Sequence, residues 1–311
     1  MSAAAVSRRR GCEVVRCRLE AIGPLDLPAT LRPLADGGGD PSWDVRADRA
    51  RRALTTPEGP AALDIVAVPG AVEVTGTGPG AGWAVERVPL MLGLHDDATG
   101  FRPQLHPLVG RLAARRPGAR FGAGSRVWDS IVPIVLGQRV TVGEARRSWW
   151  QLVRRHGTPA PGQPDLYVPP GPAVVARLGI ADWHRLGVER GRAEVVRRMV
   201  PLLPALDRAA AAGSAELQRV VTTVPGAGPW TATGLAAAVL GDPDVVLLGD
   251  LHLPHVVSWA LAREPRGGDE RMLELLEPWR GHRGRVVRLV RAAGGAPRRG
   301  PRYSPLPIAR W

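Results

Sequence analysis

The sequence contains no lysine, so all 42 of its basic residues are arginine. Schiff-base chemistry at a lysine amine is therefore excluded. Cysteine is also scarce: Cys12 and Cys17 are too few to ligate an iron–sulfur cluster or a four-thiolate zinc ion, and this scarcity is typical of a reducing compartment. No apolar run approaches the roughly 18 residues of a membrane span, and no apolar segment of a secretion signal follows the first ten residues. We therefore expect a cytoplasmic protein.

Acidic residues are sparse in the last two thirds of the chain. Residues 1–100 hold 11 Arg against 13 Asp and Glu, whereas residues 101–311 hold 31 Arg against 16. The formal net charge of +13 therefore comes from the second segment, for which a polyanion is the expected partner. Nucleic acid fits better than a membrane, because no basic amphipathic anchor or lipidation signal is present. A compositional bias with a solvated charged face is the alternative.

The length of 311 residues predicts two or three packed units. Short β-like runs separated by turn residues predict an N-terminal β-rich α+β domain over 1–100, with strands at 13–18, 64–68, 72–77 and 84–92 and one helix at 44–54. From Leu105 the apolar period becomes helical and predicts an all-α domain over 101–295. Residues 296–311 form an Arg- and Pro-rich tail.

A glycine-rich turn separates two helical segments at Pro225-Gly226-Ala227-Gly228-Pro229. Its glycines let the backbone approach a partner closely, and the helix that follows offers unpaired N–H groups and the positive end of its dipole. The turn therefore suits a phosphate backbone. An ordinary helical hairpin with a glycine cap is the alternative.

A carboxylate, Asp250, stands twenty residues after Trp230. At the mouth of the hairpin it would face a sugar beside the held phosphate, where negative charge stabilises an oxocarbenium-like transition state and can orient water. Asp250 can also cap a helix that begins near Leu251, and the two roles are compatible.

These residues form part of a longer set of motifs. Upstream stand Arg116-Pro117-Gly118 and Leu136-Gly137-Gln138-Arg139-Val140-Thr141, and downstream stands Glu277-Pro278-Trp279-Arg280-Gly281. Together with the turn, with Trp230-Thr231-Ala232 and with Asp250, they resemble the helix-hairpin-helix DNA glycosylase superfamily, most closely its 3-methyladenine DNA glycosylase II branch. The resemblance covers residues 100–290. It implies an α+β fold in which the β-rich domain precedes a mostly α-helical, two-lobed glycosylase domain.

The resemblance implies a monofunctional glycosylase of base-excision repair. Such an enzyme flips an alkylated purine of 3-methyladenine or 7-methylguanine type out of double-stranded DNA and hydrolyses its N-glycosidic bond. Asp250 is then the catalytic carboxylate, and Trp230 stands where bifunctional relatives carry a lysine, so no strand cleavage is expected. The alternatives are a same-fold enzyme for another lesion, such as a deaminated purine, and a non-catalytic DNA-binding protein.

The resemblance also assigns the remaining site residues. The base pocket takes Trp230, Gly234, Leu251 and Arg288, and the DNA contacts take Gln138, Arg139, Pro225, Gly226, Ala227, Gly228 and Thr231. Arg139 is either the wedge that fills the gap left by the flipped base or a phosphate contact. The carbonyls of Thr222, Val224 and Ala227 are expected to hold a structural Na⁺ or K⁺; no other cofactor and a monomeric state are expected. Trp279 and His252 are further candidates for the pocket wall, and Arg280, Arg283 and Arg285 for phosphate contacts, each with a packing or surface alternative.

Overall fold

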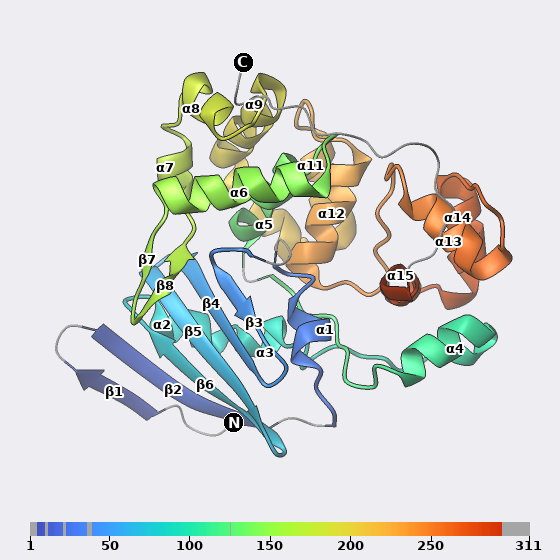
Figure 1. Cartoon of the computed structure of the whole chain (residues 1–311), viewed down its shortest axis with the longest axis horizontal. Helices are drawn as coiled ribbons and strands as arrows, with labels where there is room; N and C mark the ends of the chain where they lie inside the picture. The colour runs from blue at the N-terminus through green and yellow to red at the C-terminus, as the bar shows by residue number, and fades with distance from the viewer. Residues whose placement is uncertain (1–4, 10–11, 21–22, 36–38, 125, 294–311) are drawn as a thin grey trace.

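The computed structural model describes residues 5–9, 12–20, 23–35, 39–124 and 126–293. Its N-terminal part is a six-stranded antiparallel sheet in the order β1-β2-β6-β5-β4-β3 (Figure 1). The strands are β1 (Ala5–Arg9), β2 (Cys12–Glu20), β3 (Trp43–Val45), β4 (Arg49–Thr56), β5 (Gly59–Val68) and β6 (Ala71–Thr77). The α+β class predicted from the sequence is confirmed, whereas the predicted tail over 296–311 lies outside the described residues.

Two expectations for the N-terminal part are wrong. The helix expected over 44–54 is the β3–β4 pair, in which Trp43 lies opposite Arg52. Arg49 pairs with Asp64 on the neighbouring strand, and this charge pair across the strands supports the extended conformation. The strand expected over 84–92 is instead helical, because its buried residues recur with a helical period that begins in the preceding turn. The helices are α2 (Ala81–Glu86) and α3 (Val88–Met91).

One face of the sheet packs against short helices. These are α1 (Leu27–Leu31), α2 and α3, whose leucine, valine and alanine side chains fill one core with the inward residues of the strands. Gly76 on β6 allows α2 to approach, since a Cβ there would lie 2.6 Å from the side chain of Val85. Apolar burial on this scale stabilises the sheet as a unit.

The remainder of the chain is mostly helical. Its α-helices are α4 (Pro107–Ala114), α5 (Val127–Leu136), α6 (Val142–His156), α7 (Pro172–Val175), α8 (Ile180–Arg185), α9 (Arg190–Met199), α10 (Leu203–Ala212), α11 (Ser214–Thr222), α12 (Pro229–Leu240), α13 (Leu253–Ala262), α14 (Asp269–Leu276) and α15 (Arg283–Ala293), with 3-10 turns at Pro103–Leu105, Val200–Leu202 and Glu277–Trp279. In the described residues no helix is both long and apolar enough to cross a membrane.

The helical part is not purely helical, which corrects the all-α expectation. A β-hairpin, β7 (Thr158–Ala160) and β8 (Gln163–Val168), interrupts it within the proline-rich segment that follows α6. Its alanine, leucine and valine side chains pack on Ala53 and Ala62 of the sheet, on the face opposite α2. The hairpin therefore ties the helical part to the sheet.

Two separate cores divide the helical part into lobes. The first gathers α5–α12, and the second gathers α4, α13, α14 and α15. Residues 241–252 lead from α12 in the first lobe to α13 in the second (Figure 1). The predicted two-lobed arrangement is present, and the residues singled out at 230 and 250 stand where the chain passes between the lobes.

Candidate active site and nucleic-acid interface

The glycine-rich turn lies between α11 and α12, as the sequence predicts. Gly226 has φ +91°, a conformation that favours glycine, and a Cβ at this position would lie 2.5 Å from Val195 Cγ2. Gly228 is extended and faces open space, and Pro229 begins α12 directly after it. The exposed turn thus presents the N-terminal N–H groups of α12 with no side chain at Gly228 to obstruct them.

Trp230 and Asp250 meet at this end of α12. The indole Nε1–H of Trp230 donates a hydrogen bond of 3.0 Å to Oδ2 of Asp250. Glycine allows the close packing of the indole on its other side, because a Cβ at Gly137 would lie 3.2 Å from Cη2 of the ring. The two residues singled out separately in the sequence therefore meet in the structure, with the indole holding the carboxylate.

The Asp250 carboxylate also accepts hydrogen bonds from the backbone. Its Oδ1 receives the N–H groups of His252 and Leu253, each at 2.8 Å, so Asp250 caps the start of α13 as well as contacting Trp230. Burial by itself raises the pKa of the Asp250 carboxyl. The net pKa nevertheless lies below its ordinary value. This is because the carboxylate is stabilised by the two backbone N–H groups, by the Trp230 indole and by the charge of Arg291. The carboxylate is ionised at neutral pH.

The other residues predicted for the pocket lie in different environments. Leu251, next to Asp250, is 68 % exposed. Gly234 is one turn along α12 from Trp230, and a Cβ there would contact Ile134 at 3.6 Å. Arg288 is turned toward the sheet side, where it donates to the carbonyl of Arg120 at 2.8 Å and its guanidinium lies 3.6 Å from the ring centroid of Phe121. Burial lowers the pKa of Arg288 to about 10.

Gln138 and Arg139 form the turn between α5 and α6. The side-chain amide of Gln138 donates to the carbonyl of Gly226 at 3.0 Å and to Oγ1 of the buried Thr231 at 2.7 Å. Arg139 is exposed and has φ +55°, a left-handed conformation that costs a non-glycine residue about 1–2 kcal/mol. This conformation is what turns the chain toward α6 beside the hairpin.

The expected cation site consists of backbone carbonyls at the hairpin. The carbonyl of Val224 accepts the N–H of Ala227 at 2.9 Å, which closes the turn. The Oγ1 of Thr222 donates back to the carbonyls of α11. The carbonyl oxygens of Thr222 and Ala227 are ligands of a type that suits Na⁺ or K⁺. The cation site stays a prediction. No cluster of His, Cys, Asp or Glu suited to a metal ion occurs among the described residues.

Two further expectations are resolved by burial. Trp279 belongs to the core of the second lobe and donates its Nε1–H to the carbonyl of Arg102 at 2.8 Å, whereas His252 is exposed. Arg285 is only 7 % exposed and pairs with Asp96, so the expectation of a phosphate contact is wrong for this residue. The helical period alone gave no sign that this arginine faces inward.

Comparison with solved structures identifies the fold. A 3-methyladenine DNA glycosylase from Archaeoglobus fulgidus superimposes with a TM-score of 0.75 and 19 % identity, over 88 % of this chain and 97 % of that one. An 8-oxoguanine glycosylase/lyase from Clostridium acetobutylicum superimposes with a TM-score of 0.67 and 10 % identity, over 92 % and 96 % of the two chains. This chain has the fold of the helix-hairpin-helix DNA glycosylases.

Sequence comparison points in the same direction over half of the chain. A protein of Mycobacterium tuberculosis described as a probable bifunctional transcriptional activator/DNA repair enzyme AlkA is 29 % identical over 160 residues. The match covers 50 % of this chain and 31 % of the relative, so the chain matches less than a third of that protein's length. No family model matches the sequence. The resemblance to the 3-methyladenine DNA glycosylase II branch is nevertheless confirmed.

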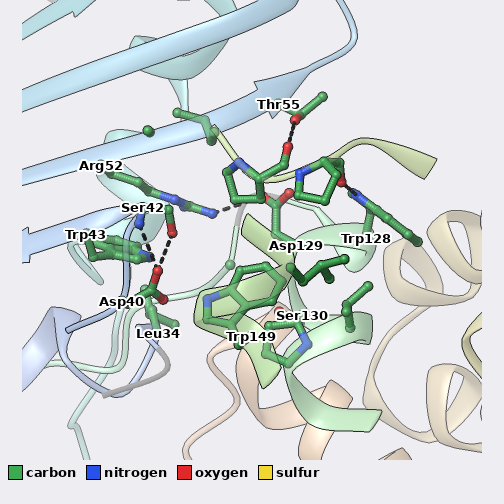
Figure 2. Close-up of a pocket in the computed structure, with 18 residues that line it drawn as sticks. Leu34, Asp40, Ser42, Trp43, Arg52, Thr55, Trp128, Asp129, Ser130 and Trp149 are labelled. Atoms are coloured by element: carbon green, nitrogen blue, oxygen red, sulfur yellow. Dashed lines mark hydrogen bonds and ion pairs between the residues drawn. The ribbon is translucent and has the colours of Figure 1, made fainter. Parts of the chain in front are cut away.

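Within this glycosylase fold a cavity lies away from Asp250. It lies between the sheet and the first helical lobe and has a volume of about 40 Å³ (Figure 2). Arg52 of β4 and Asp129 of α5 form a 2.9 Å ion pair across it, and the indole N–H of Trp149, which also lines it, is buried without a partner. A space of this size suits two or three water molecules. The cavity joins two parts of the molecule and is separate from the candidate active site.

Sequence reasoning missed two arginines of the glycosylase fold. Arg198 on α9 donates to the carbonyl of Pro225 at 3.0 Å and pairs with Glu194, so it holds the hairpin turn. Arg291, on the exposed side of α15, acts on the charge of Asp250. Neither lies in a motif, and both interactions join segments far apart in the sequence, so no local pattern indicates them.

Proposed function

We propose that this protein is a DNA glycosylase of base-excision repair that hydrolyses the N-glycosidic bond of alkylated purines in double-stranded DNA. The observation that carries the proposal is the hydrogen-bonded pair of Trp230 and Asp250 at the N-terminal end of α12, directly after the glycine-rich turn. A phosphate grip, an aromatic ring and an ionised carboxylate then lie together. This is the combination that an extruded nucleotide requires.

In the proposed reaction the turn holds a phosphate of the damaged strand. The N–H groups at the start of α12 and its dipole attract the anion, and the exposed backbone at Gly226 and Gly228 admits it closely. The flipped base stacks on Trp230, where a cationic alkylated purine gains roughly 0.5–2 kcal/mol from the aromatic face. The negative charge of Asp250 then faces the sugar.

The chemical step breaks the bond between the sugar C1′ and the purine nitrogen, and both electrons leave with the base. Positive charge develops on the sugar and is stabilised by the Asp250 carboxylate. A water molecule adds its oxygen to C1′ and releases a proton to solvent, which leaves an abasic site and the free base. Alkylation has already made the purine an electron-deficient leaving group, so the low pKa of Asp250, which prevents it from donating a proton, is compatible with this substrate.

We further propose that the enzyme is monofunctional. Cleavage of the strand by a glycosylase/lyase needs an amine nucleophile that forms a Schiff base with the sugar. The sequence has no lysine, and Trp230, which stands at the corresponding position by resemblance, has an indole nitrogen that cannot form this bond. Abasic DNA without a nick is the expected product.

The test is release of methylated purines from alkylated duplex DNA, followed by alkali to reveal abasic sites. We expect release by the wild type and strand breaks only after alkali. Asp250→Asn is expected to bind the same DNA and to lose turnover by at least 100-fold, about 2.7 kcal/mol of transition-state stabilisation. Asp64→Asn, which removes a carboxylate from the surface of the sheet, serves as the control and should retain turnover.

Two outcomes would contradict the proposal. Binding without base release by any variant would indicate a non-catalytic DNA clamp, and strand breaks before alkali would exclude a monofunctional enzyme. The same assay on duplex DNA that contains hypoxanthine tests whether the enzyme acts on a deaminated purine instead. This test is included because Gly234 and Leu251 bring no aromatic ring to the predicted pocket beside Trp230.

A further inference from the structure

The exposed side of α6 carries an unusual group of residues. Val142, Arg146, Trp150 and Arg154 lie on one side of this helix because they follow one another at intervals of four residues, and Arg147 stands beside them, three residues before Trp150. Val142 is 65 % and Trp150 48 % exposed, and the three arginines are exposed as well. We call these five residues the α6 outer face.

Several exposed arginines on or beside other helices pair with nearby glutamates. Such pairs join Arg219 to Glu216, Arg271 to Glu264 and Arg280 to Glu277. The α6 outer face differs from this pattern: among the described residues no carboxylate forms an ion pair with Arg147 or Arg154.

The acidic residue of α6 lies in its first turn, ahead of Arg147 and Arg154. Glu144 is held at the first turn, where its carboxylate accepts the backbone N–H of Thr141 in a capping box. The positive charges of Arg147 and Arg154 are therefore available to an anionic partner.

Arg154 is held in place by two aromatic rings. Its guanidinium carbon lies 5.6 Å from the ring centroid of Trp150 and 4.2 Å from that of Tyr167 on β8. Such contacts restrict a side chain that otherwise loses considerable rotamer entropy on binding. Trp150 itself points outward, whereas the neighbouring Trp149 belongs to the core. Arg154 is thus ordered before any partner arrives.

The α6 outer face continues from the candidate DNA contacts. The helix begins three residues after Arg139, and Gln138 ties this turn to the hairpin at Gly226. From there α6 crosses the front of the helical part, from the side of α11 to the side of the β7–β8 hairpin (Figure 1). The distance from Val142 to Arg154 along the helix axis is about 18 Å, which corresponds to about five phosphates of one strand at 3.4 Å each.

We propose that the α6 outer face is a second DNA contact, which binds the phosphate backbone of the duplex that flanks the lesion. This inference rests on the proposed function. Arg147 and Arg154 bind phosphates, and Trp150 packs its ring against the sugars between them. Duplex DNA is favoured over single-stranded DNA because stacking of successive bases needs a series of aromatic platforms, whereas this face exposes one tryptophan among arginines.

The test compares two undamaged duplexes, one just long enough to cover the hairpin and the α5–α6 turn, and one extended along α6 by about ten base pairs. Affinity is measured against salt concentration for the wild type and for the double variant Arg147→Ala/Arg154→Ala. We expect the slope of log affinity against log salt to fall by about 1.8 on the long duplex, about 0.9 for each lost phosphate contact. On the short duplex the slope should be unchanged.

The matched control is Arg18→Ala/Arg49→Ala. These arginines are also exposed, lie on the sheet and are paired with Glu73 and Asp64, so the control changes the net charge equally. Trp150→Ala is expected to weaken binding to the long duplex with little change in salt slope. Thermal unfolding of each variant confirms that the fold is intact.

Equal slopes for the double variant and the control on the long duplex would overturn the proposal, as would an equal loss on both duplexes. A loss that appears only when the extension is single-stranded would overturn the assignment to duplex DNA. Base release from a short alkylated duplex shows whether the α6 proposal or the proposed glycosylase function has failed. If only the α6 inference fails, this release persists; if the glycosylase activity is absent, the binding slopes still report on α6.

Discussion

The indole N–H of Trp230 and the carboxylate of Asp250 are hydrogen-bonded at 3.0 Å across the junction of the two helical lobes. Trp230 belongs to the first turn of α12, and Asp250 leads into α13. The same contact therefore orients the ring, restrains the carboxylate and helps to hold the lobes at a fixed separation. Its removal should affect turnover more than folding.

Trp230→Phe tests this relationship while keeping an aromatic ring. We expect base release to slow about tenfold, equivalent to roughly 1.4 kcal/mol, because Asp250 loses one of its three hydrogen bonds. Single-turnover kinetics measure the effect. Unchanged turnover with unchanged substrate affinity would show that the indole hydrogen bond does not orient the carboxylate.

The low pKa of Asp250 predicts a pH dependence of stability. A carboxyl whose folded pKa is depressed stabilises the fold above its unfolded pKa, about 3.9, and loses this contribution as pH falls through the folded value. Urea unfolding below about pH 4 should therefore show a shallower decline for Asp250→Asn than for the wild type. Base release by the wild type should show no loss between pH 8 and 5 that is attributable to protonation of Asp250.

The two glycines of the hairpin turn should respond differently to alanine. Gly226→Ala places a Cβ against Val195 at a positive φ, so we expect a loss of about 1–3 kcal/mol in the free energy of unfolding together with weaker DNA binding. At Gly228 the added methyl group is in open space at an allowed φ. Gly228→Ala should leave urea unfolding unchanged and weaken DNA binding alone, because the methyl group obstructs the phosphate.

The Arg52–Asp129 pair should be required for the junction between the sheet and the helices. Arg52→Met leaves the largely buried Asp129 carboxylate without its partner, and we expect unfolding to be easier by about 3–5 kcal/mol. Urea titration measures this change. The double variant Arg52→Met/Asp129→Leu should recover most of the loss, and equal destabilisation of the single and double variants would contradict the role of the pair.

The fold could be predicted in part from local patterns. Strands β5 and β6 and most helices follow from alternation and helical period, whereas β3, β4 and α2 do not. The arginines of β4 pair with Asp44 of β3 and Asp64 of β5, which lie beside them in the sheet. Such pairing is a property of the tertiary structure, and a single-sequence pattern cannot show it.

The site was more accessible to sequence reasoning than the fold. The turn, Trp230 and Asp250 lie in motifs, and the structure brings the last two into contact. The orientations of Arg285 and Arg288 were not predictable, because each is decided by distant residues, Asp96 for one and Arg120 for the other. Charge and helical period locate an arginine on a helix without showing which way its long side chain folds.

Gln138 uses both hydrogens of its amide within the protein, one on Gly226 and one on Thr231. An amide engaged in this way has no donor left for a base edge. These two hydrogen bonds hold the α5–α6 turn against the hairpin, so the two segments would contact a duplex as one rigid surface. In the proposed DNA complex, the spacing between Arg139 and the phosphate held at the turn is then set before DNA arrives, which would fix the position of the extruded nucleotide.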